Sequence, residues 1–294
     1  MNRRKFLHQT VLGGTGLLMA KGSLNALPFD KAMTSFGVQL YTLRDILFKN
    51  PQQVLEQVGA LGYNHVELFD YSDGKYFGFS IPEFKKVLAD SGLKATSSHI
   101  GTGQNNPEQK GTLVNGWEKV VEDAVALGQE YIVCPYLLPN EYESADACKR
   151  VAELLNTSAE VATNAGLKFA YHNHAFEFEN SFDGKTVMDI FLEETDPSIV
   201  QLEMDIYWIS KAGFDPIEFM RANKGRVQLW HVKDMTATEE QFFAPVGSGT
   251  IDWLKIFKKQ GLSGMKYFYV EQDAFQGIEP LQSIEKSIQY LKTL

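Results

Sequence analysis

The feature that most constrains the fold is a β-rich run that recurs eight times, each time followed by an amphipathic segment. The runs are 35–41, 63–69, 93–99, 131–135, 167–174, 199–205, 226–233 and 266–273. Between Tyr41 and Glu271, near the ends of the first and last runs, the repeat averages about 33 residues, the size of one βα unit. Eight strands that alternate with helices predict a parallel sheet that closes on itself. We therefore expect an α/β fold, a single (β/α)8 TIM barrel, with an open doubly wound sheet as the alternative.

Helical patterns occupy the segments between these runs. The expected helices include 51–61, 81–90, 117–127, 147–165, 251–260 and 281–294. Several are followed by a glycine suited to the left-handed conformation after a helix, among them Gly62, Gly128 and Gly261. The longer inserts follow strands, on the face where barrel enzymes build their sites. No linker divides the remaining chain, so residues 27–294 are expected to form one domain.

The first 26 residues are expected to be an export signal rather than part of the fold. Arg3, Arg4 and Lys5 precede an apolar stretch, 6–20, that is interrupted by glycines and too short for a transmembrane helix. The paired arginines before Phe6 and Leu7 favour a twin-arginine signal over a Sec signal or an uncleaved anchor. The chain is therefore predicted to be exported to the periplasm, with no membrane segment in its mature form.

The charge of the chain limits its partners. Four of the 28 Lys and Arg residues and none of the 37 Asp and Glu residues lie in the signal, which leaves a net charge of −13. Such a chain repels phosphate backbones, so nucleic acid and anionic membranes are excluded as expected partners. Cys134 and Cys148 are too few for a disulfide framework and are expected to be buried thiols. A homo-oligomer is compatible with this composition.

Polar residues gather at the carboxyl ends of the predicted strands, at positions of one parity. Because strand side chains alternate, residues of one parity point into the barrel. These positions are Gln39, Tyr41, Glu67, His99, His172, His174, Glu203, Asp205, His231, Lys233, Glu271 and Asp273. Their neighbours of the other parity are mostly apolar and can face the helices. The pattern predicts a polar site inside the C-terminal end of the barrel.

Four of these residues suit a divalent metal ion. His172, Asp205, His231 and Glu271 occur one per unit from the fifth strand to the eighth. A mixed imidazole and carboxylate set suits Mn, Mg, Co, Zn or Fe and leaves a position open for substrate. The alternative is that each is a polar residue satisfied on its own. We interpret the set as metal ligands because all four fall in register.

Three strand ends resemble the metal-bearing strand ends of the xylose-isomerase-like sugar isomerase/epimerase barrels. They are Leu-Glu-Met-Asp205-Ile-Tyr-Trp, Trp-His231-Val-Lys-Asp and Tyr-Val-Glu271-Gln-Asp. That superfamily includes ketose 3-epimerases, inosose dehydratase, 3-dehydroshikimate dehydratase and, more distantly, endonuclease IV. The resemblance implies a barrel with a divalent metal and a sugar-like substrate. The acidic charge disfavours the endonuclease branch.

The chain departs from this family at the fifth strand. Epimerases of the family usually place there a glutamate that binds metal and acts as one of two acid/base carboxylates, whereas this chain has Tyr171-His172-Asn173-His174. Either His172 or Glu177, three residues after His174, could supply the missing ligand. This departure favours a mechanism with a single base, and hence a lyase or dehydratase.

The expected chemistry is proton abstraction next to a carbonyl whose oxygen a metal polarises. Candidate bases are His174, Glu271 and His99, with Lys233 placed to hold or protonate an oxygen. Gln39, Tyr41, Glu67 and Glu203 are candidate substrate-binding residues, and Glu67 and Glu203 could instead orient ligating imidazoles. Trp117, Trp208, Phe69, Tyr41 and Phe176 suit either sugar stacking or core packing. Gly247-Ser248-Gly249 is interpreted as a turn rather than a phosphate loop.

Three functions are therefore compatible with the sequence. The first, which we favour on the sequence alone, is a metal-dependent isomerase or epimerase of a sugar or keto-sugar. The second keeps the pocket and eliminates a substituent, as a lyase or dehydratase of a 3-keto-glycoside or an inosose. The third, of another class, is a non-catalytic carbohydrate-binding barrel.

Overall fold

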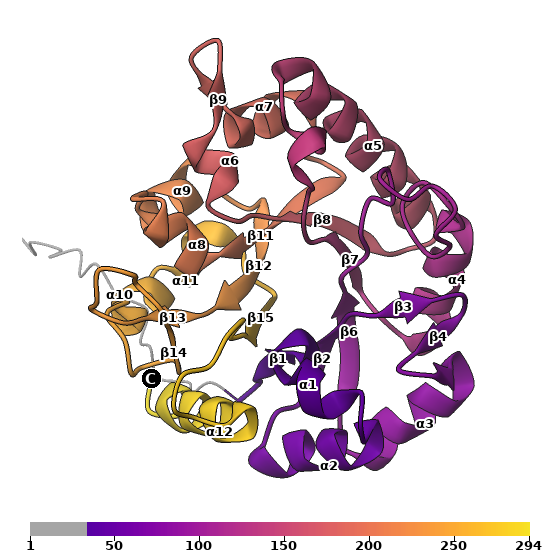
Figure 1. Ribbon diagram of the computed structural model, residues 1–294, viewed down its shortest axis with the longest axis vertical. Helices are drawn as coiled ribbons and strands as arrows, with labels where there is room; N and C mark the ends of the chain where they lie inside the picture. Colours follow the sequence, from indigo (N-terminus) through magenta and orange to yellow (C-terminus); the bar gives the residue numbers. More distant parts are fainter. Residues whose placement is uncertain (1–33) are drawn as a thin grey trace, which may run out of the picture. The chain divides into compact units, whose positions relative to one another are not determined.

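The computed structural model describes residues 34–294 and contains a parallel sheet of eight strands arranged as a barrel (Figure 1). In chain order these are β1 (Gly37–Gln39), β2 (His65–Leu68), β6 (Lys94–Ser98), β7 (Tyr131–Cys134), β8 (Lys168–His172), β11 (Val200–Asp205), β12 (Val227–Val232) and β15 (Tyr267–Val270). They lie in the spatial order β6-β2-β1-β15-β12-β11-β8-β7. The predicted TIM barrel is thus confirmed, and the open doubly wound sheet is wrong. The expected export signal lies outside the described residues.

The ring is joined between β6 and β7 by only a few backbone contacts. His99 and Val133 form an isolated parallel bridge, and the amide of Ile100 donates to the carbonyl of Val133 at 2.8 Å. Below them the amide of Glu130 donates to the carbonyl of Thr96 at 3.0 Å. The barrel is therefore nearly closed, with its weakest seam at this point.

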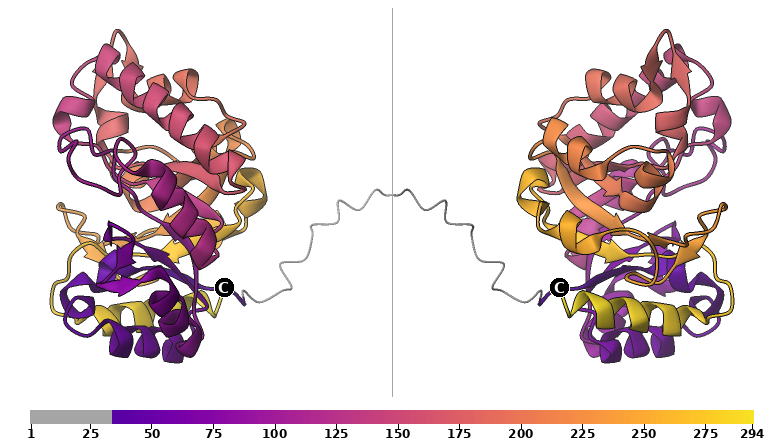
Figure 2. Two further views of the ribbon diagram at one scale, coloured as in Figure 1. Left: turned by 90° about the vertical axis from the view of Figure 1, so that its right-hand side faces the viewer. Right: turned by 90° about the vertical axis from the view of Figure 1, so that its left-hand side faces the viewer.

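Helices surround the barrel, as Figures 1 and 2 show. The α-helices are α1 (Arg44–Leu47), α2 (Pro51–Leu61), α3 (Ile81–Asp90), α4 (Trp117–Leu127), α5 (Ala145–Asn164), α6 (Phe176–Glu179), α7 (Val187–Glu194), α8 (Ile206–Lys211), α9 (Pro216–Ala222), α10 (Trp253–Phe257), α11 (Gln260–Ser263) and α12 (Pro280–Leu291). The short 3-10 helices η1 (Leu40–Leu43) and η2 (Pro139–Glu141) follow β1 and β7. No helix in residues 34–294 is long and apolar enough to cross a membrane.

Two expectations about helix ends differ in outcome. Gly62 and Gly128 end α2 and α4 with φ of +101° and +90°, as predicted. The predicted helix 251–260 is wrong, because the carboxylate of Asp252 accepts from the amide of Lys255 and starts the helix only at Trp253. That helix stops at Phe257, and Gly261 lies inside the separate α11, which Gly264 ends.

Several of the predicted inserts form small antiparallel sheets. Residues 71–80 contain β3 (Tyr71–Ser72), β4 (Lys75–Tyr76) and β5 (Phe79–Ser80). β9 (Ser181–Phe182) pairs with β10 (Lys185–Thr186), and β13 (Asp234–Met235) pairs with β14 (Phe243–Ala244). These elements follow β2, β8 and β12, so they border the end of the barrel where the polar residues gather.

The core has two parts separated by the strands. The large cluster lies between strands and helices and contains the neighbours of apolar parity, such as Val66, Met204 and Trp230. The opposite faces of the strands form a smaller cluster of Tyr131, Val133, Ala170, Leu229 and Tyr269.

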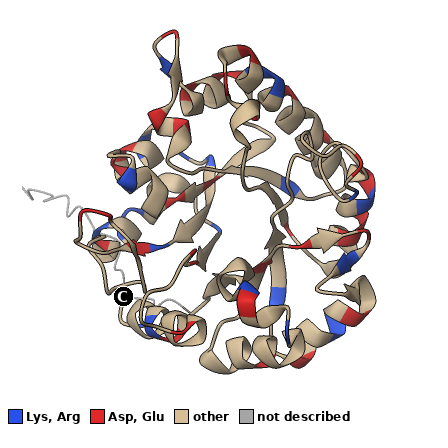
Figure 3. Cartoon of the chain, in the orientation of Figure 1, with Lys and Arg blue, Asp and Glu red and all other residues tan. Residues whose placement is uncertain are grey.

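Cys134 and Cys148 are free and buried, as expected. Charged positions lie on the outer helices but also on strands near the centre (Figure 3).

Candidate metal centre and active site

Three predicted ligands converge at the carboxyl ends of β11, β12 and β15. Asp205, His231 and Glu271 each offer one ligand atom, and these atoms lie within 4.8 Å of one another. His231 Nδ1 is 2.6 Å from Glu271 Oε2. His172 Nε2, on the neighbouring β8, is 3.7 Å from Asp205 Oδ2. The parallel register brings the four strand ends together.

Two buried glutamates engage the inward nitrogens of these imidazoles. His231 Nε2 is 2.5 Å from Glu67 Oε2, and His172 Nδ1 is 2.9 Å from Glu203 Oε2. Such carboxylate partners fix the tautomer of an imidazole and leave its other nitrogen free to bind a metal. The other two nitrogens face the remaining candidate ligands: His231 Nδ1 contacts Glu271 Oε2, and His172 Nε2 lies 3.7 Å from Asp205 Oδ2.

His99 completes this buried layer. Its Nε2 lies 3.0 Å from Glu67 Oε2 and 2.9 Å from Glu203 Oε2. Burial opposes a charge on His99, but the two carboxylates raise its pKa to about 9. Burial also opposes the charge on Glu67, yet His99 and His231 hold its pKa well below the ordinary value. Burial and the charge of Glu67 raise the pKa of Glu203.

Lys233 lies among the carboxylates, two residues after His231. Its ammonium is 2.9 Å from Asp205 Oδ2 and 2.7 Å from Glu271 Oε2. It also donates to both oxygens of Asp273, at 3.2 and 3.0 Å. These carboxylates raise the pKa of Lys233 despite its burial, and Lys233 and His231 lower that of Glu271.

The donor set fits a divalent cation. Asp205 Oδ2 accepts no well-oriented hydrogen bond within the described residues, although the Lys233 ammonium lies close to it. A buried carboxylate oxygen in this state is available as a ligand. The ammonium already shows that a cation is favoured between Asp205 and Glu271. Two carboxylates and two imidazoles suit Mn, Co, Zn or Fe better than an all-oxygen site would.

A pocket of about 820 Å³ lies over this centre. Its polar lining is His99, His172, His174, Glu179, Lys233, Glu271 and Asp273. Its apolar and aromatic lining is Tyr41, Phe69, Pro135, Tyr136, Tyr142, Ala175, Phe176 and Trp208. Among the aromatics, Tyr41 and Tyr136 are 40% and 47% exposed, so both are free to contact a ligand.

His174 lies beside the candidate ligand His172, with ring centroids 5.0 Å apart, and the ring of Phe176 lies parallel to it at 6.0 Å. Burial, and next the charge of Lys233, lower the pKa of His174 to about 3, so the ring is neutral at pH 7. Its Nδ1 has no protein partner among residues 34–294. His174 is therefore a neutral ring with one nitrogen that no group in the described part of the chain binds by a hydrogen bond.

Glu177, the other candidate for the fifth-strand ligand, is engaged elsewhere. Its Oε1 accepts from the hydroxyl of Tyr171 at 2.7 Å, and its Oε2 from the amide of His174 at 2.8 Å. It is fully buried and does not line the pocket. His172 is therefore the residue of this segment that faces the candidate ligand Asp205.

Gln39, Glu67 and Glu203 are fully buried and absent from the pocket lining. Gln39 donates to Glu67 Oε2 at 2.9 Å and accepts from the amide of Tyr41. The expected direct contact with substrate does not fit this placement, because imidazoles lie between these groups and the pocket. The alternative role for Glu67 and Glu203, orienting imidazoles, does fit it. Of the predicted substrate-binding residues, Tyr41 alone lines the pocket.

Other expectations are settled by local contacts. Trp117 is buried in α4, donates to the carbonyl of Ser158 and packs on Phe169, so it belongs to the core. The amides of Gly247 and Gly249 both donate to the carboxylate of Asp234, which agrees with a turn.

Sequence reasoning missed Asn173, whose side-chain oxygen accepts from the amide of Asp205 at 3.1 Å and holds β8 against β11. An amide side chain between two histidines was the available signal.

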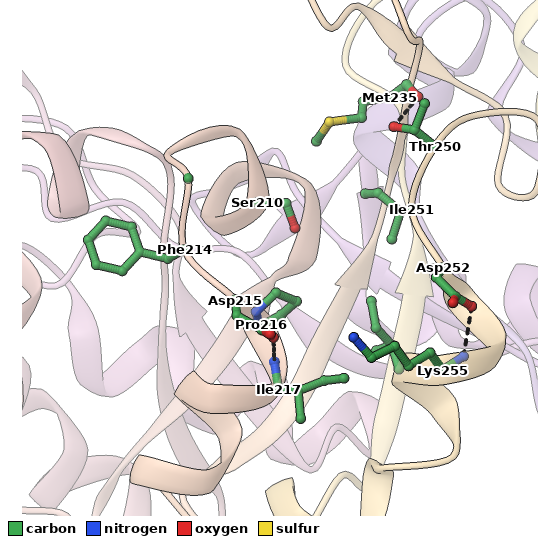
Figure 4. Close-up of a pocket in the computed structure, with 12 residues that line it drawn as sticks. Ser210, Phe214, Asp215, Pro216, Ile217, Met235, Thr250, Ile251, Asp252 and Lys255 are labelled. Carbon is green, nitrogen blue, oxygen red and sulfur yellow. Dashed lines mark hydrogen bonds between the residues drawn. The ribbon is translucent and has the colours of Figure 1, made fainter.

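A second hollow of about 420 Å³ lies between α8, α9 and the segment before α10 (Figure 4). The two carboxylates that line this second hollow, Asp215 and Asp252, each cap the start of a helix. Asp215 accepts from the amide of Ile217 at 2.7 Å, and Asp252 from that of Lys255 at 3.0 Å. It contains none of the predicted site residues, so the pocket over the strand ends is the candidate site.

Comparison with known proteins agrees with this fold. Residues 55–294 match the xylose isomerase-like TIM barrel family, and the chain belongs to it. An inosose dehydratase from Geobacillus kaustophilus is 25% identical over 240 residues, which cover 70% of this chain and 74% of that protein. A solved sugar phosphate isomerase/epimerase from Parabacteroides distasonis is 28% identical, with a TM-score of 0.74 over 92% of this chain and 97% of that one.

A third relative is similar in fold. The IolI protein, solved with a bound zinc atom, is 15% identical, with a TM-score of 0.67 over 88% of this chain and 98% of that one. A metal ion is thus found in a protein of this fold, and this chain has a His and carboxylate cluster able to hold one.

Proposed function

We propose that this chain is a metal-dependent lyase or dehydratase of a keto-sugar or an inosose-like cyclitol. It removes a proton from the carbon next to a carbonyl and eliminates an oxygen substituent from the following carbon. The observation that carries the proposal is the composition of the site. Asp205, His231 and Glu271 converge below the pocket, whereas the fifth barrel strand presents His172 and His174 in place of a carboxylate. Glu177 is held by Tyr171 and cannot act as a second carboxylate base from its observed position.

The metal would be held by His172, Asp205, His231 and Glu271. A divalent ion there would polarise a carbonyl oxygen and acidify the neighbouring C–H bond. Glu67 and Glu203 orient the two imidazoles through their inward nitrogens. The aromatic lining excludes water from the reacting carbon and supplies apolar faces for a ring-shaped substrate.

The remaining polar groups of the pocket supply the acid and the base. His174 is neutral and takes the proton from carbon. As the C=C bond forms, the C–O bond of the leaving group breaks and its oxygen takes up a proton. His99 is placed to give that proton, because Glu67 and Glu203 keep it protonated while its ring lines the pocket. Opposite protonation states in one pocket suit an elimination, which needs an acid and a base together.

An isomerase or epimerase is the second candidate, favoured by the name of the 28% identical solved relative. Both reactions begin with loss of the same proton. They differ in whether a substituent is then lost or the proton is returned.

Incubation of the metal-loaded protein with inososes and 3-keto-glycosides in D2O separates these candidates. The proposal predicts release of water or of the aglycone and an absorbing enone or enol product. Deuterium incorporation without loss of a substituent would instead identify an isomerase or epimerase. Binding of the sugar without either reaction would indicate a carbohydrate-binding barrel. Under the proposal, His174→Ala should abolish turnover and leave substrate binding intact.

A further inference from the structure

Lys233 occupies the position that a metal ion would need. Its ammonium lies 2.9 Å from Asp205 Oδ2 and 2.7 Å from Glu271 Oε2, two of the expected ligand atoms. The side chain is 2% exposed, so water cannot screen this charge effectively. A divalent ion bound to the same two oxygens would lie in contact with the ammonium. The two cations therefore exclude each other.

A second carboxylate is already in place to receive the ammonium. Asp273 lies two residues after Glu271, and both of its oxygens accept from Lys233, at 3.2 and 3.0 Å. Its side chain is 23% exposed and lines the pocket, whereas the side chains of Asp205 and Glu271 are 0% and 5% exposed. A small rotation of the flexible Lys side chain toward Asp273 would vacate the site without leaving the ammonium unpaired.

We propose that Lys233 is an exchangeable internal cation. It neutralises Asp205 and Glu271 when no metal is bound, and a divalent ion displaces it to Asp273. The exchange keeps the buried carboxylates paired in both states, which avoids the cost of an uncompensated buried charge. It also keeps the ammonium at the wall of the pocket, beside Asp273, where it can contact an oxygen of the substrate. This inference rests on the metal site of the proposed function and adds the residue that competes for it.

Metal affinity of the full chain tests the exchange without reference to activity. Titration with Mn2+ and with Zn2+, followed by calorimetry and by competition with a chromogenic chelator, compares the wild type with Lys233→Met and Asp273→Asn. Removing the competing cation should tighten binding at least tenfold in Lys233→Met. Removing the receiving carboxylate should weaken binding several-fold in Asp273→Asn. Lys211→Met is the matched control, because Lys211 contacts Tyr207 and the carbonyl of Glu240 rather than the cluster, and it should bind as the wild type does.

Thermal unfolding provides an independent readout. Metal-free Lys233→Met should melt below the wild type, because its buried carboxylates lose their cation, and metal should raise its melting temperature by more than it raises that of the wild type. Equal or weaker affinity in Lys233→Met would overturn the exchange while leaving the metal site standing. No binding by the wild type and Lys233→Met would overturn both. If Lys233→Met does not fold, unchanged affinity in Asp273→Asn overturns the exchange.

Discussion

At the scale of single residues, the site depends on how each imidazole is oriented. His231 and His172 each direct one nitrogen to a buried glutamate and the other toward Asp205 and Glu271. The strand alternation in the sequence is enough to predict that these side chains share the interior of the barrel. Which nitrogen faces which carboxylate depends on contacts between residues up to 164 positions apart, and these are not encoded in any local pattern.

The first prediction concerns the carboxylate ligands. Asp205→Asn and Glu271→Gln should each lower metal affinity by more than the ~10–100-fold that loss of an orienting partner causes. The metal-free stability of Asp205→Asn should change little, because Lys233 keeps Glu271 and Asp273 as partners. The amide oxygen of the new side chain can also still accept from the amide of Trp208, as Asp205 does at 2.9 Å. Calorimetric titration and urea unfolding without metal measure the two quantities.

The exposed Glu218 of α9, substituted as Glu218→Gln, is the control for loss of one negative charge. Unchanged affinity in Asp205→Asn would remove this residue from the metal site. A large loss of metal-free stability would instead mark the carboxylate as structural.

The second prediction concerns Glu177. Burial raises its pKa to about 8, against 4.5 for an ordinary glutamate, although the Tyr171 hydroxyl lowers it in part. Between these pH values the unfolded chain has lost the proton that the folded chain retains, so stability falls as pH rises, by an amount on the order of a few kcal/mol. Glu177→Gln should remove this fall. Urea unfolding at pH 5, 6.5 and 8 checks it, and parallel pH profiles of the two proteins would contradict it.

At the scale of elements, the strands follow the predicted runs closely, whereas helices and loops depart from them. Each observed barrel strand lies within its predicted run, because a short run rich in β-branched and aromatic residues between turn residues is a strong strand signal. The helix expected over 251–260 is shorter than predicted, because Asp252 caps its start at Trp253 and the chain leaves the helix after Phe257 before the separate α11. The sequence leaves both His172 and Glu177 open as ligands, because it does not show that Glu177 lies in α6, a single turn after β8, where the Tyr171 hydroxyl holds its carboxylate.

The third prediction concerns the seam between β6 and β7, which is joined by the His99–Val133 bridge and few hydrogen bonds. Weakly paired segments open locally at lower free energy than the rest of a fold. The amides of Ile100 and Glu130 should exchange with deuterium roughly tenfold or more faster than those of β11 and β12, which corresponds to about 1.4 kcal/mol. Hydrogen exchange followed by mass spectrometry measures this. Equal protection around the ring would show that the barrel is fully closed.

At the scale of the whole molecule, the eight units of about 33 residues determine both the fold and the place of the site. A closed parallel barrel brings the carboxyl ends of all strands to one rim, so ligands separated by 26 to 40 residues in the sequence meet there. The sequence could therefore predict the fold and the composition of the site. It could not predict that Lys233 lies between two of the ligands, since that depends on the height of each side chain above the rim.

The most direct test of the metal centre is anomalous diffraction from crystals grown with Mn2+. One peak should lie within coordination distance of Asp205 Oδ2, His231 Nδ1 and Glu271 Oε2, with His172 Nε2 as the fourth protein ligand and the Lys233 ammonium displaced toward Asp273. A crystal without a peak at this position, or with a peak only among His99, Glu67 and Glu203, would contradict the account.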